Sequence, residues 1–76
     1  MTKQEWMEQF AKNLREKIKR SGFTREELAF RMNMSEPNIS AYINKRRTPS
    51  VKSVINLAYA LDCGIDELID FGDIIE

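Results

Sequence analysis

The sequence contains no histidine, one cysteine, two prolines and three glycines among its 76 residues. Without histidine, imidazole catalysis and histidine-based zinc sites are excluded. The lone cysteine, Cys63, cannot form an internal disulfide, which is typical of a reducing compartment, and we interpret it as a small nonpolar residue of the core. The longest nonpolar run, residues 57–61, is far too short to cross a membrane. We therefore expect a cytoplasmic chain without a membrane segment.

The sequence also lacks the residue groups that enzymes use. It has no convincing acid–base pair, no cluster of metal ligands and no glycine-rich phosphate loop. We therefore expect no catalytic residue, no cofactor, no metal site and no small-molecule substrate. A length of 76 residues allows one small domain, and 42% hydrophobic with 32% charged residues favours a folded domain over disorder.

Charge is unevenly distributed along the chain, although the formal net charge is zero. All 12 lysines and arginines lie within residues 1–61 together with six acidic residues, which gives this part a net charge of +6. The last 15 residues carry six acidic residues and no basic one. Such a division is typical of a basic working face and an acidic end turned away from it, although chance segregation of solvated charges gives the same pattern.

The spacing of nonpolar residues predicts helices and gives no support to strands. In residues 3–20, Trp6, Phe10, Leu14 and Ile18 recur every fourth position, as on the buried face of a helix. Further helices are predicted to begin after Thr24, Ser35 and Ser50, and a short fifth helix is predicted over residues 65–69. The fold class is therefore all-α, with a compact domain over residues 1–70 and a tail over residues 71–76.

Local signals mark the ends of these helices. Thr24 and Glu27 have the spacing of a capping box, in which side chain and backbone satisfy each other at a helix start. Gly22 suits the left-handed position that ends a helix, and Asn33 tolerates the positive φ of a sharp turn. Ser35 is expected to cap the third helix, with proline accepted in its first turn.

Residues 23–69 resemble the Cro/phage-repressor-like helix-turn-helix family, also called XRE-like. The matching motifs are T-x-E-E-L-A at 24–29, the Asn33-x-Ser35 turn, Ile39, a polar connector ending in Pro49, L-A-x-A-L at 57–61 and I-D-E-L at 65–68. The resemblance implies a five-helix, lambda-repressor-like domain whose second and third helices form the DNA-binding pair. It implies that the third helix enters the major groove of double-stranded DNA.

Carried over residue by residue, the resemblance implies two sets of DNA contacts. The base contacts are expected from Glu36, Pro37, Asn38, Ser40 and Ala41. The phosphate contacts are expected from Arg25, Asn44, Lys45, Arg46, Arg47 and Lys52. A carboxylate such as Glu36 accepts a hydrogen bond from a cytosine amino group, and a methyl group such as that of Ala41 contacts thymine.

The chain departs from the family pattern at several positions. Glu36 and Pro37 replace long amide side chains that are common in these repressors, so bidentate reading of adenine is not expected there. Lys45 occupies a position where glycine is frequent, so the backbone of the connector can follow a different course here. Ile43 replaces a common glutamate, and Ile18 replaces the basic residue that pairs with it in some relatives. We interpret the last two changes as linked, with a nonpolar contact in place of a buried ion pair, and we expect Ile18 and Ile43 to touch.

Two function classes remain open from the sequence. The first is a sequence-specific transcriptional regulator, a small repressor of phage, prophage or bacterial type that binds a two-fold symmetric operator as a homodimer. Its dimer surface is expected to include Ile55, Tyr59, Phe71, Ile74 and Ile75, which lie off the main helical stripe or in the tail. The second is an antitoxin-like protein-interaction module on the same fold.

Overall fold

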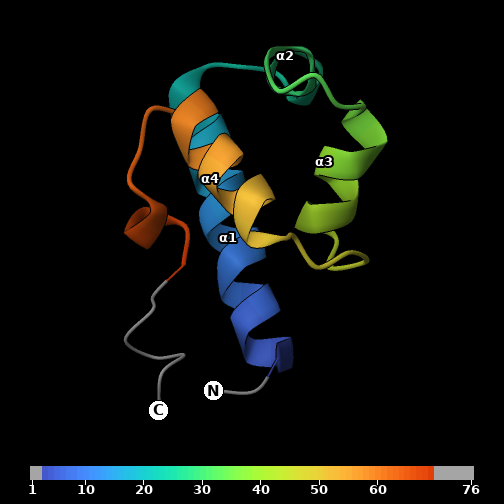
Figure 1. Ribbon diagram of the computed structural model, residues 1–76, viewed down its shortest axis with the longest axis vertical. Helices are drawn as coiled ribbons and strands as arrows, with labels where there is room; N and C mark the ends of the chain where they lie inside the picture. Colours follow the sequence, from blue (N-terminus) through green and yellow to red (C-terminus); the bar gives the residue numbers. More distant parts are fainter. Residues whose placement is uncertain (1–2, 70–76) are drawn as a thin grey trace.

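The computed structural model describes residues 3–69 as four α-helices and one 3-10 turn (Figure 1). The helices are α1 (Lys3–Ser21), α2 (Arg25–Arg31), α3 (Glu36–Ile43) and α4 (Val51–Ala60), and the 3-10 turn is η1 (Ile65–Glu67). Residues 3–69 contain no strand, which confirms the all-α class. None of the helices in this range combines the length and hydrophobicity of a transmembrane span.

The predicted fifth helix over residues 65–69 is corrected to a single 3-10 turn, Ile65–Glu67. The N–H groups of Leu68 and Ile69 both donate to the carbonyl of Ile65, at 3.0 Å each, and the segment goes no further as a helix. A single turn gains too few hydrogen bonds to propagate an α-helix. Its capping is as expected for an acidic first turn, because the N–H of Gly64 donates to the Glu67 carboxylate at 2.6 Å.

Helix α1 supplies one side of the core. Phe10 and Leu14 are fully buried and Ile18 is 7% exposed, which confirms the stripe predicted from the four-residue spacing. Trp6 is half-buried and stacks on Phe10, with ring centroids 5.8 Å apart and planes inclined by 9°. The helix ends at Ser21, because Gly22 takes a φ of +80° that reverses the chain direction at no steric cost.

The start of α2 and the turn between α2 and α3 form largely as their sequence predicts. Glu27 N–H donates to the Thr24 hydroxyl at 3.0 Å and Thr24 N–H donates to the Glu27 carboxylate at 3.1 Å, which completes the capping box. Asn33 takes a φ of 55°, as expected for the sharp turn. Ser35 occupies the cap position of α3, but its side chain makes no cap hydrogen bond.

The missing bond of Ser35 corrects the prediction and has a local cause. Pro37 has no N–H to donate, and the N–H of Asn38 donates to the backbone carbonyl of Ser35 at 3.1 Å instead of its hydroxyl. Ser50 does cap α4, since its hydroxyl accepts from Ser53 N–H at 3.1 Å.

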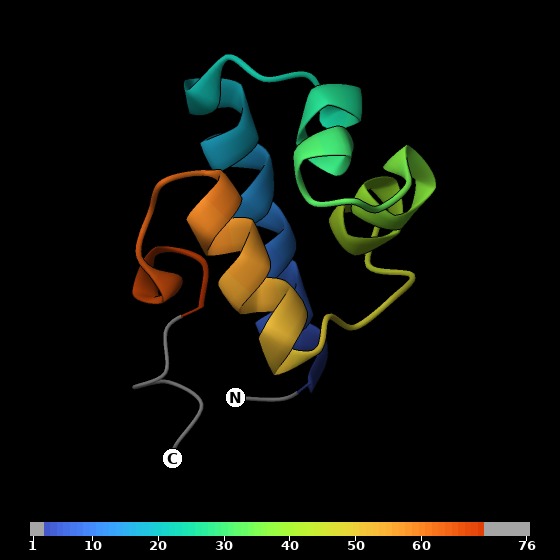
Figure 2. The ribbon, with the colours of Figure 1, turned by 45° about the horizontal axis from the view of Figure 1, so that its top comes forward.

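The core lies where α1, α3 and α4 converge. Figures 1 and 2 both show α4 running along α1, with α2 and α3 as a separate pair beside them. Ile18 and Ile43 are both buried in this one hydrophobic cluster, as their proposed linkage requires, while their direct contact stays a prediction. The cluster also includes Leu28, Ile39, Tyr42, Val54, Leu57 and Leu68.

Candidate DNA-binding interface

Helix α3 presents one nonpolar face to the core and one polar face outward. Its buried residues are Ile39, Tyr42 and Ile43, at 0–5% exposed. The other positions of α3 are accessible in part or in full: Pro37 is exposed, and Glu36, Asn38, Ser40 and Ala41 are half-buried. Because 36, 37, 40 and 41 follow the helical repeat, they share the face opposite the buried one. All five expected base-contact residues are thus accessible.

A hydrogen-bonded chain joins the start of α2 to this outer face. The Ser40 hydroxyl donates to Oε1 of Glu36 at 2.5 Å, within one turn of α3. Nη1 of Arg25 donates to the same Ser40 oxygen at 3.3 Å. The capping box at Thr24 fixes Arg25 as the first residue of α2, and so places its guanidinium at the edge of α3. Sequence reasoning named all three residues and missed the bonds between them.

The connector after α3 carries three consecutive cations. Residues 44–48 are all exposed, and the chain leaves α3 through Lys45, whose φ of 61° lies in the left-handed region. The next residue, Arg46, donates its N–H to the carbonyl of Ala41 at 2.8 Å, which closes the helix end. The chain therefore makes the turn that glycine favours with a lysine in its place.

The cations of the connector have different partners. Nη1 of Arg47 donates to Oδ1 of Asn38 at 2.9 Å, so this arginine lies against α3. Nζ of Lys45 lies 3.8 Å from a carboxylate oxygen of Glu8 on α1, and both side chains are about half exposed. An exposed ion pair of this kind contributes little to stability and is readily exchanged for another anion.

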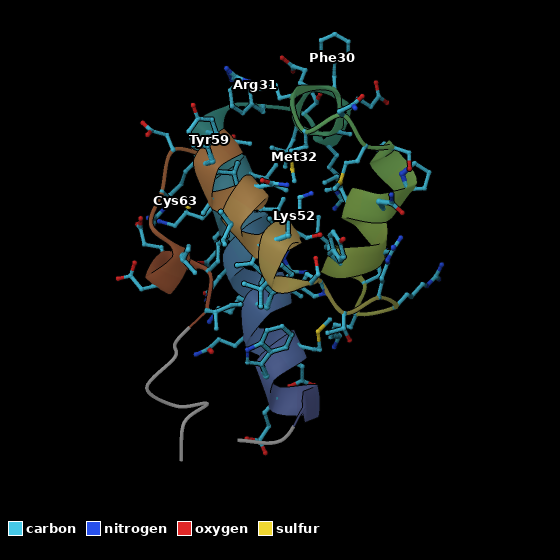
Figure 3. The ribbon with its side chains drawn as sticks, in the orientation of Figure 1. Phe30, Arg31, Met32, Lys52, Tyr59 and Cys63 are labelled. Carbon is cyan, nitrogen blue, oxygen red and sulfur yellow. The ribbon has the colours of Figure 1, made fainter. Side chains whose placement is uncertain are left out.

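Lys52 completes the expected set of phosphate contacts from the first turn of α4. Figure 3 shows it projecting on the side of α4 toward α3. The hydroxyl groups of Tyr42 and the neighbouring Ser53 lie 3.4 Å apart, which holds this turn against α3. Of the five expected basic residues, Arg25 and Arg47 therefore hydrogen-bond to residues of α3. The other three, Lys45, Arg46 and Lys52, lie on the connector after α3 or in the first turn of α4, and α3 itself carries one acidic residue, Glu36.

This arrangement agrees with comparisons to known proteins. A family model described as helix-turn-helix matches residues 14–68, which is more than half of the chain. The chain belongs to the Cro/C1-type (XRE-like) helix-turn-helix family. It is thus of the DNA-binding transcription-regulator type. The comparison with curated proteins finds no match.

Two solved structures of this helix-turn-helix type superpose on the chain. One is the restriction-modification controller protein C.AhdI from Aeromonas hydrophila, with a TM-score of 0.78 and 28% identity over 83% of this chain and 96% of that chain. The other is a hypothetical transcription factor, NHTF, from Neisseria, with a TM-score of 0.80 and 22% identity over 97% of this chain and 85% of that chain. The second likeness shows the fold alone.

The residues expected at a dimer surface are only partly brought together. Ile55 and Tyr59 are 45% and 89% exposed on α4. Tyr59 lies at the α2 end of α4 near Arg31 (Figure 3), where both line one surface hollow. Ile55 lines a different one, together with Trp6. The other expected members, Phe71, Ile74 and Ile75, lie outside the described residues.

Two exposed nonpolar side chains stand out beside these. Phe30, anticipated from its position off the buried stripe of α2, is 87% exposed and points away from the body in Figure 3. Val51, which sequence reasoning missed, is 78% exposed at the start of α4. The sequence did contain a signal for this exposure, because Val51 lies four residues before Ile55 and so shares its face of the helix.

Cys63, the one cysteine of the chain, lies beside the core. Cys63 is half-buried against the core, and burial raises the pKa of its thiol, with the nearby Glu67 carboxylate adding to the effect. A raised pKa keeps the thiol protonated and a poor nucleophile. No group of three or more metal-ligating side chains occurs in the part of the chain that the structure describes.

Proposed function

We propose that this chain is a sequence-specific regulator that reads the major groove of double-stranded DNA with α3. The observation that carries this proposal is the outer face of α3, where short side chains lie between Arg25 on one side and the basic connector on the other. A B-DNA major groove about 12 Å wide admits one α-helix. Short side chains on that face allow the helix to approach the base edges closely.

Base contacts are assigned to Glu36, Pro37, Asn38, Ser40 and Ala41. Glu36 accepts from the Ser40 hydroxyl through Oε1, which orients its carboxylate before DNA arrives. The second oxygen of that carboxylate is then available to a cytosine amino group. Ala41 supplies a methyl surface for thymine.

Phosphate contacts are assigned to Arg25, Asn44, Lys45, Arg46, Arg47 and Lys52. In the free protein Arg25 and Arg47 donate to residues of α3. On DNA their guanidinium groups would turn to the backbone oxygens, which they can grip through two parallel N–H groups. Arg47 would then release the Asn38 side chain to the bases, so that phosphate binding and base reading occur together.

We propose further that residues 1–70 act as the DNA-binding domain of a two-fold homodimer. A single domain with a handful of phosphate contacts would bind with a Kd of about 10⁻⁴ to 10⁻⁶ M. Two copies on half-sites about 34–36 Å apart gain the affinity a regulator needs. The dimer surface is assigned to Ile55, Tyr59 and the tail residues Phe71, Ile74 and Ile75.

The regulatory role that we propose is that of a small repressor of phage, prophage or bacterial type. The likeness to a restriction-modification controller protein supports a regulator that acts through one such domain. A repressor of this kind would lower expression from a promoter that overlaps its operator. A reporter gene placed under the selected operator tests the sign, and an increase in expression would refute the repressor assignment.

Selection from a random duplex library tests DNA reading and symmetry together. We expect a two-fold symmetric consensus whose half-sites lie about one helical turn apart. The alternative, an antitoxin-like interaction module, predicts no enrichment and no retardation of random duplex in a gel at low salt. Enrichment of an asymmetric half-site would support base reading by α3 and refute the dimer.

A further inference from the structure

The hydroxyl group of Ser40 takes part in two hydrogen bonds on the outer face of α3. It donates to Oε1 of Glu36, with the two oxygens 2.5 Å apart. It accepts from Nη1 of Arg25 at 3.3 Å. The partners set the direction of both bonds, because a carboxylate only accepts hydrogen bonds and a guanidinium group only donates them. The proton of Ser40 therefore points to Glu36, and its oxygen faces Arg25.

These two bonds determine what the Ser40 side chain can still offer to DNA. A serine hydroxyl group has one proton and two acceptor lone pairs. Glu36 takes the proton and Arg25 takes one lone pair, so one lone pair remains on this half-buried side chain. When Arg25 turns to a phosphate, the second lone pair becomes free as well, but the proton stays with Glu36. Ser40 therefore meets a base as an acceptor and not as a donor.

We propose that Ser40 selects a base with an exocyclic amino group, cytosine or adenine, because Glu36 holds its only proton. In the major groove, cytosine N4 and adenine N6 carry donors, whereas guanine and thymine present acceptors alone. An ordinary serine reads either kind of edge, since its hydroxyl group is free to turn. The inference rests on the proposed reading of the major groove by α3, and it adds a preference that serine alone does not have.

Glu36 would thus act on two bases, one that it contacts and one that it does not touch. Glu36 and Ser40 are four residues apart and share one face of α3, so the helix presents two acceptors side by side. Toward the base that Ser40 contacts, Glu36 is a positioning residue. Removing its carboxylate leaves the Ser40 hydroxyl free to rotate, so that it accepts from one base or donates to another. A serine that reads its base independently would keep its preference after that change.

Library selection with variants of the full-length chain separates these two cases. Ser40→Ala identifies the half-site position that Ser40 contacts, as the position where all preference is lost. In the wild type we expect cytosine or adenine there, favoured over guanine and thymine by about fivefold, as for one hydrogen bond. Glu36→Ala should lose its own base preference and should also remove the preference at the Ser40 position.

The matched control is Glu26→Ala, which removes a carboxylate from the first turn of α2, where the side chain is exposed. We expect this control to leave the selected sequence unchanged. A relaxed Ser40 position in the control would make charge alone the cause and would overturn the proposal. Guanine or thymine at the Ser40 position of the wild type would overturn it too, as would an unchanged preference there in Glu36→Ala. Enrichment of no sequence at all would instead refute the proposed function.

A second measurement needs no variant of the protein. In a duplex of the selected sequence, each cytosine or adenine is replaced in turn by a pyrimidinone or purine that lacks the amino group, and binding of the wild-type chain is followed by fluorescence anisotropy. We expect the affinity to fall by about fivefold or more at two or more positions in each half-site, one for Glu36 and one for Ser40. A loss at a single position, or at none, would overturn the proposal.

Discussion

The salt dependence of DNA binding gives the sharpest test of the basic connector. The perturbation is the double substitution of Arg46→Ala and Arg47→Ala. Both side chains are exposed and neither belongs to the core, so the fold should be unaffected. The hydrogen bond of the Arg47 side chain to Asn38 is an exposed one. What is lost is therefore positive charge beside α3.

The expected magnitude follows from counting phosphate contacts. Five basic residues per protomer are assigned to phosphates, and each neutralised phosphate contributes about −0.9 to the slope of log Kobs against log salt. The slope is then about −4.5 for one protomer and about −9 for a dimer, and the double variant reduces these to about −2.7 and −5.4. Between about 50 and 200 mM salt, the wild-type dimer should lose about five orders of magnitude in affinity and the variant about three.

Fluorescence anisotropy of a labelled random duplex, titrated at several salt concentrations, measures this slope. Arg20→Ala is the matched control, because Arg20 is an exposed arginine whose charge acts on Glu67 rather than beside α3. We expect this control to leave the slope unchanged. The assignment of the connector to phosphates fails if the double variant keeps the wild-type slope, or if the control flattens it equally.

Three further predictions concern specificity, backbone strain and acid stability. Glu36→Gln should change the base preferred at one half-site position from cytosine to adenine, with a discrimination of about 1–3 kcal/mol. Repeating the library selection with the variant measures this change. An unchanged consensus would show that Glu36 does not contact a base. Lys45→Gly should raise the free energy of unfolding by about 1 kcal/mol, because glycine adopts the left-handed backbone conformation of this position without steric strain. The substitution loses only a weak ion pair with Glu8. It should also make the salt slope of DNA binding less steep by about 0.9 per protomer. The variant would then be more stable and bind DNA more weakly. A lower denaturation midpoint would contradict the proposal that the backbone at Lys45 is strained. The Lys17 ammonium donates to Oε1 of Glu67 at 2.7 Å and holds the pKa of that carboxyl below its usual value. This pair therefore stabilises the fold fully at a pH above the usual pKa of glutamate. The stabilisation is lost as the pH falls through the lowered pKa of Glu67. Lys17→Met should reduce that acid-dependent loss in urea titrations at neutral and acidic pH, and an equal loss in both proteins would refute the coupling.

Much of the fold could be predicted because its signals are local. The capping box at Thr24, the positive φ of Asn33 and the glycine turn at Gly22 each depend on a few adjacent residues, and each forms as expected. The four-residue stripe of α1 likewise fixes which face is buried. A local cause also explains why the Ser35 side chain makes no cap hydrogen bond. Pro37 has no N–H group, and the N–H of Asn38 donates to the backbone carbonyl of Ser35. The preference for serine at helix starts predicts the cap position, but it does not predict whether the side-chain hydroxyl or the backbone carbonyl accepts the hydrogen bond.

What the sequence did not give is decided by residues that are distant along the chain. Arg25 reaches Ser40 across 15 positions, and this contact turns two separate lists of expected DNA contacts into one hydrogen-bonded unit. The surface hollow lined by Ile55 brings together Trp6 near the start of α1 and Ile69 at the end of the described chain, and no local periodicity predicts that meeting. Because Pro49 and Val51 line the same hollow, this nonpolar surface adjoins the end of the connector that carries the basic residues.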